Sequence, residues 1–160
     1  MITEATYTHS GRPKKLIFDI NKFSKFKDKI IYIVVDQQPP DLLEIKESDN
    51  DEKDTRGQKL VLNGYKRDNY QRQKAQQALN NVDPEDWIII NDIDEIPNLK
   101  NVDMRKIKNT LIIFKQQIFY YKFNLLYPAI SWYGSRACKK KNFLSPQWLR
   151  NTKHKKYSLW

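Results

Sequence analysis

Apolar residues along the chain gather in short blocks separated by polar stretches, and the clearest block is Trp87–Ile90. It is rich in β-branched residues and has polar residues on both sides, so it predicts a buried strand. Two other apolar blocks, residues 30–35 and 111–114, also predict strands. Residues 1–7 alternate weakly and could form a strand, and the alternation at residues 119–125 predicts a strand with one exposed face. The helical spacing of Ile20, Phe23 and Phe26 predicts a short amphipathic helix.

Two further helices are expected between these strands, of which the second is short. The first covers residues 68–82, with Asp68 as its N-cap, and the second lies between Pro97 and Thr110. Residues 37–64 are acidic and begin with prolines, so they predict a surface loop. Strand, helix and strand in succession form a βαβ unit, which has parallel strands. The expected fold class is therefore α/β, with a mostly parallel sheet flanked by helices, in a single domain of 160 residues.

Carboxylates follow the strand Trp87–Ile90 directly, because Asp92, Asp94 and Glu95 all precede Pro97. Ligands of open α/β sheets bind at the carboxyl ends of the strands, and two aspartates one residue apart can approach one hard cation together. Such a cation would also offset the repulsion between the clustered carboxylates. The pattern predicts a divalent metal that faces a diphosphate. A solvated turn is the alternative interpretation of a bare Asp-x-Asp motif.

Other polar residues next to predicted elements have two interpretations each. Asp36 follows the strand at 30–35 and could contact a nucleotide or serve as a turn residue. Arg67 and Arg72 flank the start of the predicted helix and could reach a phosphate or remain solvated. The aromatic residues Tyr121 and Trp132 lie near polar donors, as in a sugar-binding cleft, although core packing is the alternative for each ring.

Charge is divided unevenly along the chain. Residues 1–103 carry all 19 Asp and Glu against 16 Lys and Arg, whereas residues 104–160 carry 13 Lys and Arg and no Asp or Glu. The basic part suits an anionic partner such as a nucleic acid or a phosphate-bearing ligand. A surface that only aids solubility is the alternative.

Other features bear on the cellular setting. The single cysteine, Cys138, excludes an internal disulfide framework and a Cys-rich zinc site. The first residues form neither a signal peptide nor an anchor, and no apolar run is long enough to span a membrane. We therefore expect a cytoplasmic protein with no membrane span.

Several motifs in one order resemble glycosyltransferase family 17, which includes the enzyme that adds bisecting N-acetylglucosamine to N-glycans. Asn91-Asp92-Ile93-Asp94-Glu95-Ile96-Pro97 is similar to the family's Ser-Asp-Val-Asp-Glu-Ile-Pro signature. Further similar segments cover nearly the whole chain: Glu4-Ala5-Thr6-Tyr7-Thr8-His9-Ser10-Gly11-Arg12-Pro13-Lys14, Lys29-Ile30-Ile31, Arg67-Asp68-Asn69-Tyr70-Gln71-Arg72, Asp83-Pro84-Glu85-Asp86, Tyr120-Tyr121, Trp132-Tyr133-Gly134, Lys139 to Lys141, Ser145-Pro146-Gln147 and Leu149-Arg150.

The resemblance implies a GT-A-type, Rossmann-like fold that binds a UDP-sugar, with UDP-N-acetylglucosamine as the expected donor, and transfers the sugar to a glycan acceptor. It implies Mn²⁺ or Mg²⁺ on the diphosphate, where the metal acts as a Lewis acid. Asp94 would be the direct metal ligand, and Asp92 would contact the ribose or reach the metal through water. An inverting transfer needs a carboxylate base, for which Glu95 is the nearest candidate. Support of the metal-binding turn is the alternative role for Glu95.

The remaining candidate residues divide between two parts of the chain. Residues 1–103 would form the part that binds the nucleotide-sugar and the metal, and residues 104–160 a basic, aromatic part on the acceptor side. Candidates for contact with the nucleotide-sugar are Glu4, Asp36, Arg67, Asp68, Arg72 and Asp92. Candidates for the acceptor or phosphate side are Tyr121, Trp132, Gly134, Arg136 and Lys139.

The chain also departs from the family pattern. The family has an earlier strand and helix before the Glu4 region and a further segment after the Leu149-Arg150 region. The sequence is therefore consistent with a minimal enzyme or with a shortened, inactive one. Two alternative functions follow: a catalytically inactive module that binds a nucleotide-sugar, and a nucleic-acid-binding protein that uses the basic part, although we expect no nucleic acid as a partner.

Overall fold

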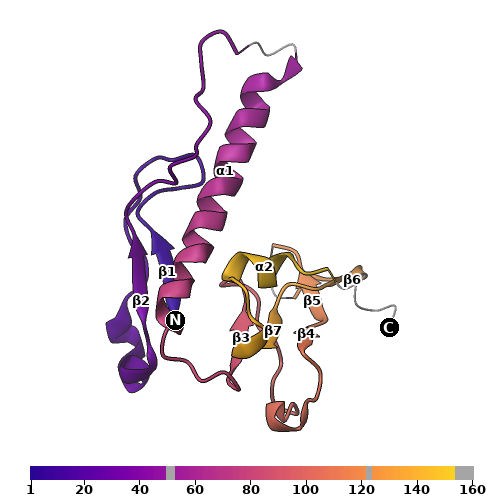
Figure 1. Cartoon of the computed structure of the whole chain (residues 1–160). Coiled ribbons are helices and arrows are strands. Elements are labelled where there is room, and N and C mark those ends of the chain that lie inside the picture. Colours follow the sequence, from indigo (N-terminus) through magenta and orange to yellow (C-terminus); the bar gives the residue numbers. More distant parts are fainter. Residues whose placement is uncertain (50–52, 122–123, 154–160) are drawn as a thin grey trace. The chain divides into compact units, whose positions relative to one another are not determined.

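A computed structural model describes residues 1–49, 53–121 and 124–153 of the chain. It divides the chain into two compact units, Met1–Asn80 and Asn81–Trp160, whose elements are labelled in Figure 1. The division at residue 103 expected from the charge pattern falls inside the second unit. Each unit is described by itself below.

The first unit contains a small parallel sheet and a long helix. Strand β1 (Ile2–Ala5) pairs with β2 (Tyr32–Val35), with Ile2 opposite Tyr32 and Ala5 opposite Val35. The connection between the strands includes the 3₁₀ helix η1 (Ile20–Lys29), whose N-cap Asp19 accepts a hydrogen bond from the Asn21 N–H. Helix α1 (Thr55–Lys74) continues into the 3₁₀ helix η3 (Ala75–Leu79). Ala5, Tyr7 and Val35 are buried together, and Tyr70 of α1 packs against them.

Helix α1 begins much earlier than the sequence predicts. It starts at Thr55 after Asp54, so Asp68 lies inside the helix and is not its N-cap. The prediction of a surface loop through residue 64 is therefore wrong for its last ten residues. The acidic composition of this region gave no sign that Asn63 is buried and paired. Its side-chain amide accepts from the Leu43 N–H at 2.7 Å and donates to the Leu43 carbonyl at 2.8 Å. This pair ties the helix to the preceding segment.

The second unit contains two small antiparallel sheets. In the first sheet, β7 (Arg136–Lys139) lies between β3 (Trp87–Ile90) and β4 (Leu111–Ile113). In the second sheet, β5 (Gln116–Phe119) pairs with β6 (Leu126–Trp132). Two 3₁₀ helices, η4 (Met104–Lys106) and η5 (Lys140–Asn142), lie in the connections, and helix α2 (Pro146–Asn151) ends the described part.

The core of the second unit lies where α2 contacts β7 and β3. Its buried apolar side chains are Ile88, Ile90, Ala137, Cys138, Phe143 and Leu149. Ala137, Cys138 and Leu149 are all fully buried, so β7 and α2 each contribute side chains to this core. The hydroxyl of Ser145 accepts from the Trp148 N–H and so caps the start of α2, and Pro146 occupies the first turn.

The predicted GT-A-type, Rossmann-like sheet of mostly parallel strands is wrong. The strand Trp87–Ile90 pairs antiparallel with Arg136–Lys139, and among the described strands β1 and β2 form the one parallel pair. The expected βαβ unit rested on the assumption that strands consecutive along the chain are neighbours in one sheet. The actual neighbour of Trp87–Ile90 has only two apolar residues in four, so its sequence does not show the pattern of a core strand.

The other predicted elements have mixed outcomes. The strands predicted at 1–7, 30–35, 87–90 and 111–114 are confirmed. The predicted short helix with Ile20, Phe23 and Phe26 forms as the 3₁₀ helix η1, which is interrupted at Phe23 by non-helical backbone angles. The short helix predicted between Pro97 and Thr110 is confirmed only as the three-residue 3₁₀ helix η4 in this polar, turn-rich segment. The strand predicted at 119–125 is also wrong: β5 ends at Phe119, Tyr121 has a left-handed φ of 58°, and β6 begins at Leu126. Residues 122 and 123 of that segment lie outside the described residues.

In the described ranges, every helix is too short or too polar to cross a membrane.

Candidate functional site

The turn Asp92–Glu95 follows β3 and is closed by two reciprocal hydrogen bonds. The Glu95 N–H donates to the Asp92 carbonyl at 3.0 Å, and the Asp92 N–H donates to Glu95 Oε2 at 3.0 Å. Glu95 therefore folds back over its own turn and is only 6% exposed, whereas Asp94 projects into solvent. Because Ile90 is buried in the sheet, the turn starts from a fixed point.

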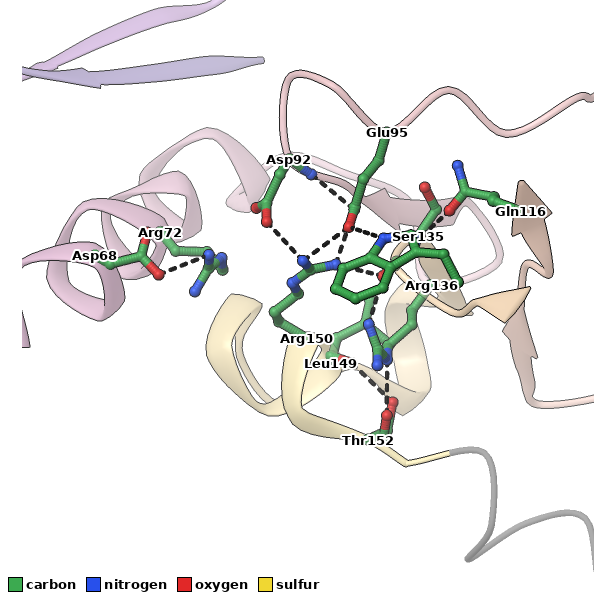
Figure 2. A network of polar contacts seen from close by, with 12 residues as sticks. Asp68, Arg72, Asp92, Glu95, Gln116, Ser135, Arg136, Leu149, Arg150 and Thr152 are labelled. Atoms are coloured by element: carbon green, nitrogen blue, oxygen red, sulfur yellow. Dashed lines mark hydrogen bonds and ion pairs between the residues drawn. The ribbon is translucent and has the colours of Figure 1, made fainter. Parts of the chain in front are cut away.

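Arg150, from the last turn of α2, joins the buried carboxylate of Glu95 to the partly exposed carboxylate of Asp92 (Figure 2). Its Nη1 and Nη2 donate to Glu95 Oε2 and Oε1, both at 2.8 Å, and Nη2 also donates to Asp92 Oδ2 at 2.6 Å. Such a bidentate pair fixes the plane of the carboxylate as well as its position. Beyond its place in the family pattern, the sequence did not mark Arg150 as a site residue. The available signal was that residues 104–160 carry 13 Lys and Arg and no Asp or Glu, so an arginine of this part that pairs with an acidic side chain must reach one before residue 104.

Trp132 and Gly134 complete the surroundings of Glu95. The Trp132 indole Nε1 donates to Glu95 Oε1 at 2.8 Å. A Cβ placed on Gly134 would lie 2.0 Å from Glu95 Oε1 and 2.2 Å from Trp132 Nε1, so a side chain here would collide with both groups. The Gly134 carbonyl accepts hydrogen bonds from the guanidinium groups of Arg136 and Arg150. Glycine is thus required at this position by close packing.

Electrostatics keep Glu95 ionised. Burial by itself would raise the pKa of Glu95, but hydrogen bonds from Arg150, the Asp92 N–H and Trp132 outweigh it and lower the pKa. Burial and the neighbouring charge of Arg150 lower the pKa of Arg136, while Glu95 and Asp92 oppose this shift. Arg136 also donates to the Thr152 carbonyl at 2.7 Å (Figure 2). The site is a compact network in which two arginines and two carboxylates are joined through hydrogen bonds and the Gly134 carbonyl.

The carboxylates of the turn fit a metal ion only if a further ligand completes its coordination shell. In the described part of the chain, no group of three or more His, Cys, Asp or Glu side chains could hold a metal ion. Asp92 and Asp94 are two hard oxygen ligands on one turn. Mg²⁺ and similar ions are commonly held by one or two carboxylates, with substrate phosphates and water completing the shell. The residues therefore fit an ion that arrives with, or is completed by, a phosphate-bearing ligand.

Comparison with known proteins assigns the chain to a family. The sequence model of glycosyltransferase family 17 matches residues 1–154. The chain belongs to glycosyltransferase family 17. No curated protein and no solved structure matches the chain. Membership of the family implies transfer of a sugar from a nucleotide-sugar donor to an acceptor.

Within this family 17 chain, the second unit brings together five of the predicted site residues: Asp92, Glu95, Trp132, Gly134 and Arg136. Lys139 lies elsewhere. Trp87 is opposite Lys139 and Ile90 is opposite Arg136, so Lys139 is at the other end of β3 from the turn, where it pairs with Glu85 at 2.6 Å. Tyr121 is fully exposed at the end of the β5–β6 hairpin.

The remaining candidates belong to the first unit. Glu4 accepts four hydrogen bonds, from Lys14, the N–H groups of Ile17 and Phe18, and the Tyr32 hydroxyl. Arg67 donates to Gln38 Oε1 at 2.6 Å and to the His9 carbonyl at 3.0 Å, and its guanidinium lies against Gly11.

Asp68 and Arg72 form an i, i+4 ion pair on α1 at 3.0 Å, and Asp36 is exposed after β2. Contact of these first-unit residues with a nucleotide-sugar stays a prediction.

Proposed function

We propose that this family 17 chain is a metal-dependent glycosyltransferase that moves a sugar from a UDP-sugar to a glycan acceptor with inversion, and that the sugar is N-acetylglucosamine. The observation that carries the proposal is the arrangement of the Asp92–Glu95 turn. Arg150 fixes the buried carboxylate of Glu95 and the partly exposed carboxylate of Asp92, while Asp94 is exposed to solvent. A rigid turn with one outward carboxylate is suited to bind a cation that also contacts a diphosphate.

Each residue of the turn has a distinct role in this proposal. Asp94 binds the metal directly, and Asp92 orients the turn and contacts the ribose or a metal-bound water. Mn²⁺ or Mg²⁺, when bound, supplies positive charge that stabilises the leaving UDP. Arg136, held by the Gly134 and Thr152 carbonyls beside the turn, adds positive charge on the same side.

Glu95 is assigned to support of the turn rather than to proton transfer. Both of its carboxylate oxygens already accept hydrogen bonds, and its lowered pKa makes it a weak proton acceptor. This role is the second of the two alternatives that the sequence left open. The acceptor side is proposed to include Trp132, which lies next to Glu95.

Calorimetric titration tests the donor site. UDP and UDP-N-acetylglucosamine are titrated into the wild type with Mn²⁺ or with EDTA, and into Asp94→Ala and the control Asp86→Ala. Asp86 is an exposed aspartate at the opposite end of β3, so the control removes the same charge away from the turn. We expect binding that requires both Mn²⁺ and Asp94 and that survives in Asp86→Ala. Equal binding to all three proteins, or none to the folded wild type, would overturn the proposal.

A second measurement separates transfer from binding alone. Release of free UDP is followed with glycan acceptors added to the wild type and to Asp94→Ala. Turnover that Asp94→Ala abolishes supports an enzyme. Binding of UDP-N-acetylglucosamine without turnover on any tested acceptor instead favours the inactive nucleotide-sugar-binding module.

A further inference from the structure

Three apolar side chains lie in solvent around the Asp92–Glu95 turn. Ile93 is 97% exposed and Ile96 is 80% exposed, on either side of Glu95, and Trp132, which contacts Glu95, is 45% exposed. Apolar side chains gathered around a charged site commonly mark a place where a ligand or partner binds. The turn therefore offers an apolar rim as well as carboxylates.

The indole of Trp132 is both exposed and held in place. Its Nε1 donates to Glu95 Oε1, and the same oxygen accepts from Arg150 Nη2. Arg150 therefore holds the Glu95 carboxylate, and this carboxylate holds the indole ring. Gly134, two residues after Trp132, has no side chain, and the Glu95 carboxylate and the indole N–H occupy the space that a Cβ would fill. A ring that is anchored at one edge loses little conformational entropy when a ligand covers its face.

The chemistry around this ring favours a sugar over a nucleobase. Asp92 and Asp94, the more exposed carboxylates of the turn, accept hydrogen bonds when ionised, whereas both oxygens of the buried Glu95 already have donors. A pyranose presents hydroxyl donors at its edge and C–H groups on its face, which match carboxylates and an aromatic ring respectively. Uracil presents mainly carbonyl acceptors at its edge, which the carboxylates would repel.

We propose that the exposed face of Trp132 is the stacking platform for a pyranose ring bound at the Asp92–Glu95 turn, and that Glu95 is the positioning residue that holds the indole. This inference rests on the proposed function, because it names the chemical class of ligand that the same site recognises. The pyranose belongs either to the donor or to the acceptor, and the experiment separates these sources.

The test compares the wild type with Trp132→Ala, Trp132→Phe and the control Phe119→Ala. Phe119 is a matched aromatic residue, 42% exposed, near the opposite end of the same hairpin from Trp132. Calorimetry measures binding of UDP, UDP-N-acetylglucosamine, chitotriose and mannotriose in the presence of Mn²⁺. Circular dichroism first confirms that each variant is folded.

We expect Trp132→Ala to weaken sugar binding by roughly tenfold and Trp132→Phe to weaken it less, since phenylalanine keeps a ring but loses the N–H. Phe119→Ala should bind as the wild type does. If Trp132→Ala weakens UDP-N-acetylglucosamine but not UDP, the platform serves the donor sugar; if it weakens an oligosaccharide, the platform serves the acceptor.

Two results would overturn the proposal that Trp132 stacks on a pyranose ring. One is that Trp132→Ala binds every sugar as tightly as the wild type. The other is that the folded wild type binds no oligosaccharide and binds UDP-N-acetylglucosamine no more tightly than UDP. In both cases Asp94-dependent binding of UDP would leave the proposed donor site standing, so the two failures are distinguishable.

The positioning role of Glu95 has a spectroscopic test. The near-ultraviolet circular dichroism of the wild type minus that of Trp132→Phe isolates the signal of the fixed indole. We expect Glu95→Ala to lose this signal and Glu95→Gln to recover part of it, because glutamine retains an oxygen that accepts from the indole N–H. An unchanged signal in Glu95→Ala would overturn the positioning role.

Discussion

Arg150 and Glu95 lie 55 positions apart in the sequence and form a bidentate ion pair in which both N···O distances are 2.8 Å. Both side chains are largely removed from solvent. The pair joins helix α2 to the turn that follows β3, so the short helix and the carboxylate turn form one structural unit. The geometry depends on the planar fork of the guanidinium, which a single ammonium group does not reproduce.

Replacing Arg150 by lysine should therefore destabilise the second unit even though the charge is kept. We expect Arg150→Lys to lower the free energy of unfolding by about 2 kcal/mol, because charge-assisted hydrogen bonds to Glu95 and Asp92 are lost. All four tryptophans follow Asn80, so their fluorescence during urea unfolding reports on this unit. Arg105→Lys is the control, since Arg105 is 91% exposed and should change stability by less than about 0.5 kcal/mol. Equal stability of the two variants would contradict the structural role of the fork.

Two glycine substitutions should act in opposite directions. Gly134→Ala places a Cβ about 2 Å from groups that Arg150 holds in place, so it should destabilise the second unit by about 2 kcal/mol. Gly64→Ala lies within α1, where the nearest atom to the new Cβ is the His9 carbonyl oxygen at 3.5 Å, an ordinary contact. It should stabilise the first unit by about 0.5–1 kcal/mol through helix propensity. Thermal unfolding followed by far-ultraviolet circular dichroism measures both. A neutral Gly134→Ala would show that Glu95 can move.

The strand Trp87–Ile90 and its polar continuation were predictable from sequence because four consecutive apolar residues and the switch to carboxylates are local features. The strand that pairs with it, Arg136–Lys139, was not predictable from the sequence. Arg136–Lys139 pairs with two strands, yet only Ala137 and Cys138 in it are apolar, and both are small. Hydrophobic periodicity predicts which residues are buried, but it does not show which distant segment covers them.

The candidate site divides in the same way. The sequence pattern correctly grouped Asp92, Asp94 and Glu95 on one turn, since their spacing is local. It did not predict that Glu95 faces inward while Asp94 faces outward. That difference depends on Arg150 and Trp132, which reach the turn through long-range packing, and on a glycine whose role becomes visible only in three dimensions.

The four hydrogen bonds that Glu4 accepts should make the stability of the first unit vary with pH in the acidic range. Burial by itself would raise the pKa of Glu4, but its four hydrogen bonds outweigh this and lower the pKa to about 2 from an ordinary 4.5. A depressed carboxylate pKa stabilises the fold above the unfolded value and loses that effect as pH falls toward the folded value. The stability advantage of wild type over Glu4→Gln should therefore be complete near neutral pH and decline between about pH 4.5 and 2.

Denaturant unfolding at a series of pH values, followed by far-ultraviolet circular dichroism, measures the Glu4 effect. Glu44→Gln is the control, because Glu44 is exposed and makes only a loose ion pair with Lys46 at 3.8 Å. A constant difference between wild type and Glu4→Gln across this range would contradict the depressed pKa.

Cys138 should report on the opening of the sheet β3, β7 and β4. It is fully buried in the middle strand, and burial raises the pKa of its thiol to about 11. Because the thiolate is the reactive form, the native protein should react with 5,5′-dithiobis(2-nitrobenzoic acid) far more slowly than the unfolded chain. The labelling rate should follow the equilibrium for opening of the second unit, so Arg150→Lys should label faster and Gly64→Ala should label as the wild type does. Labelling of native protein at the rate of the urea-unfolded chain would show that the thiol is accessible and that β7 is not a protected central strand.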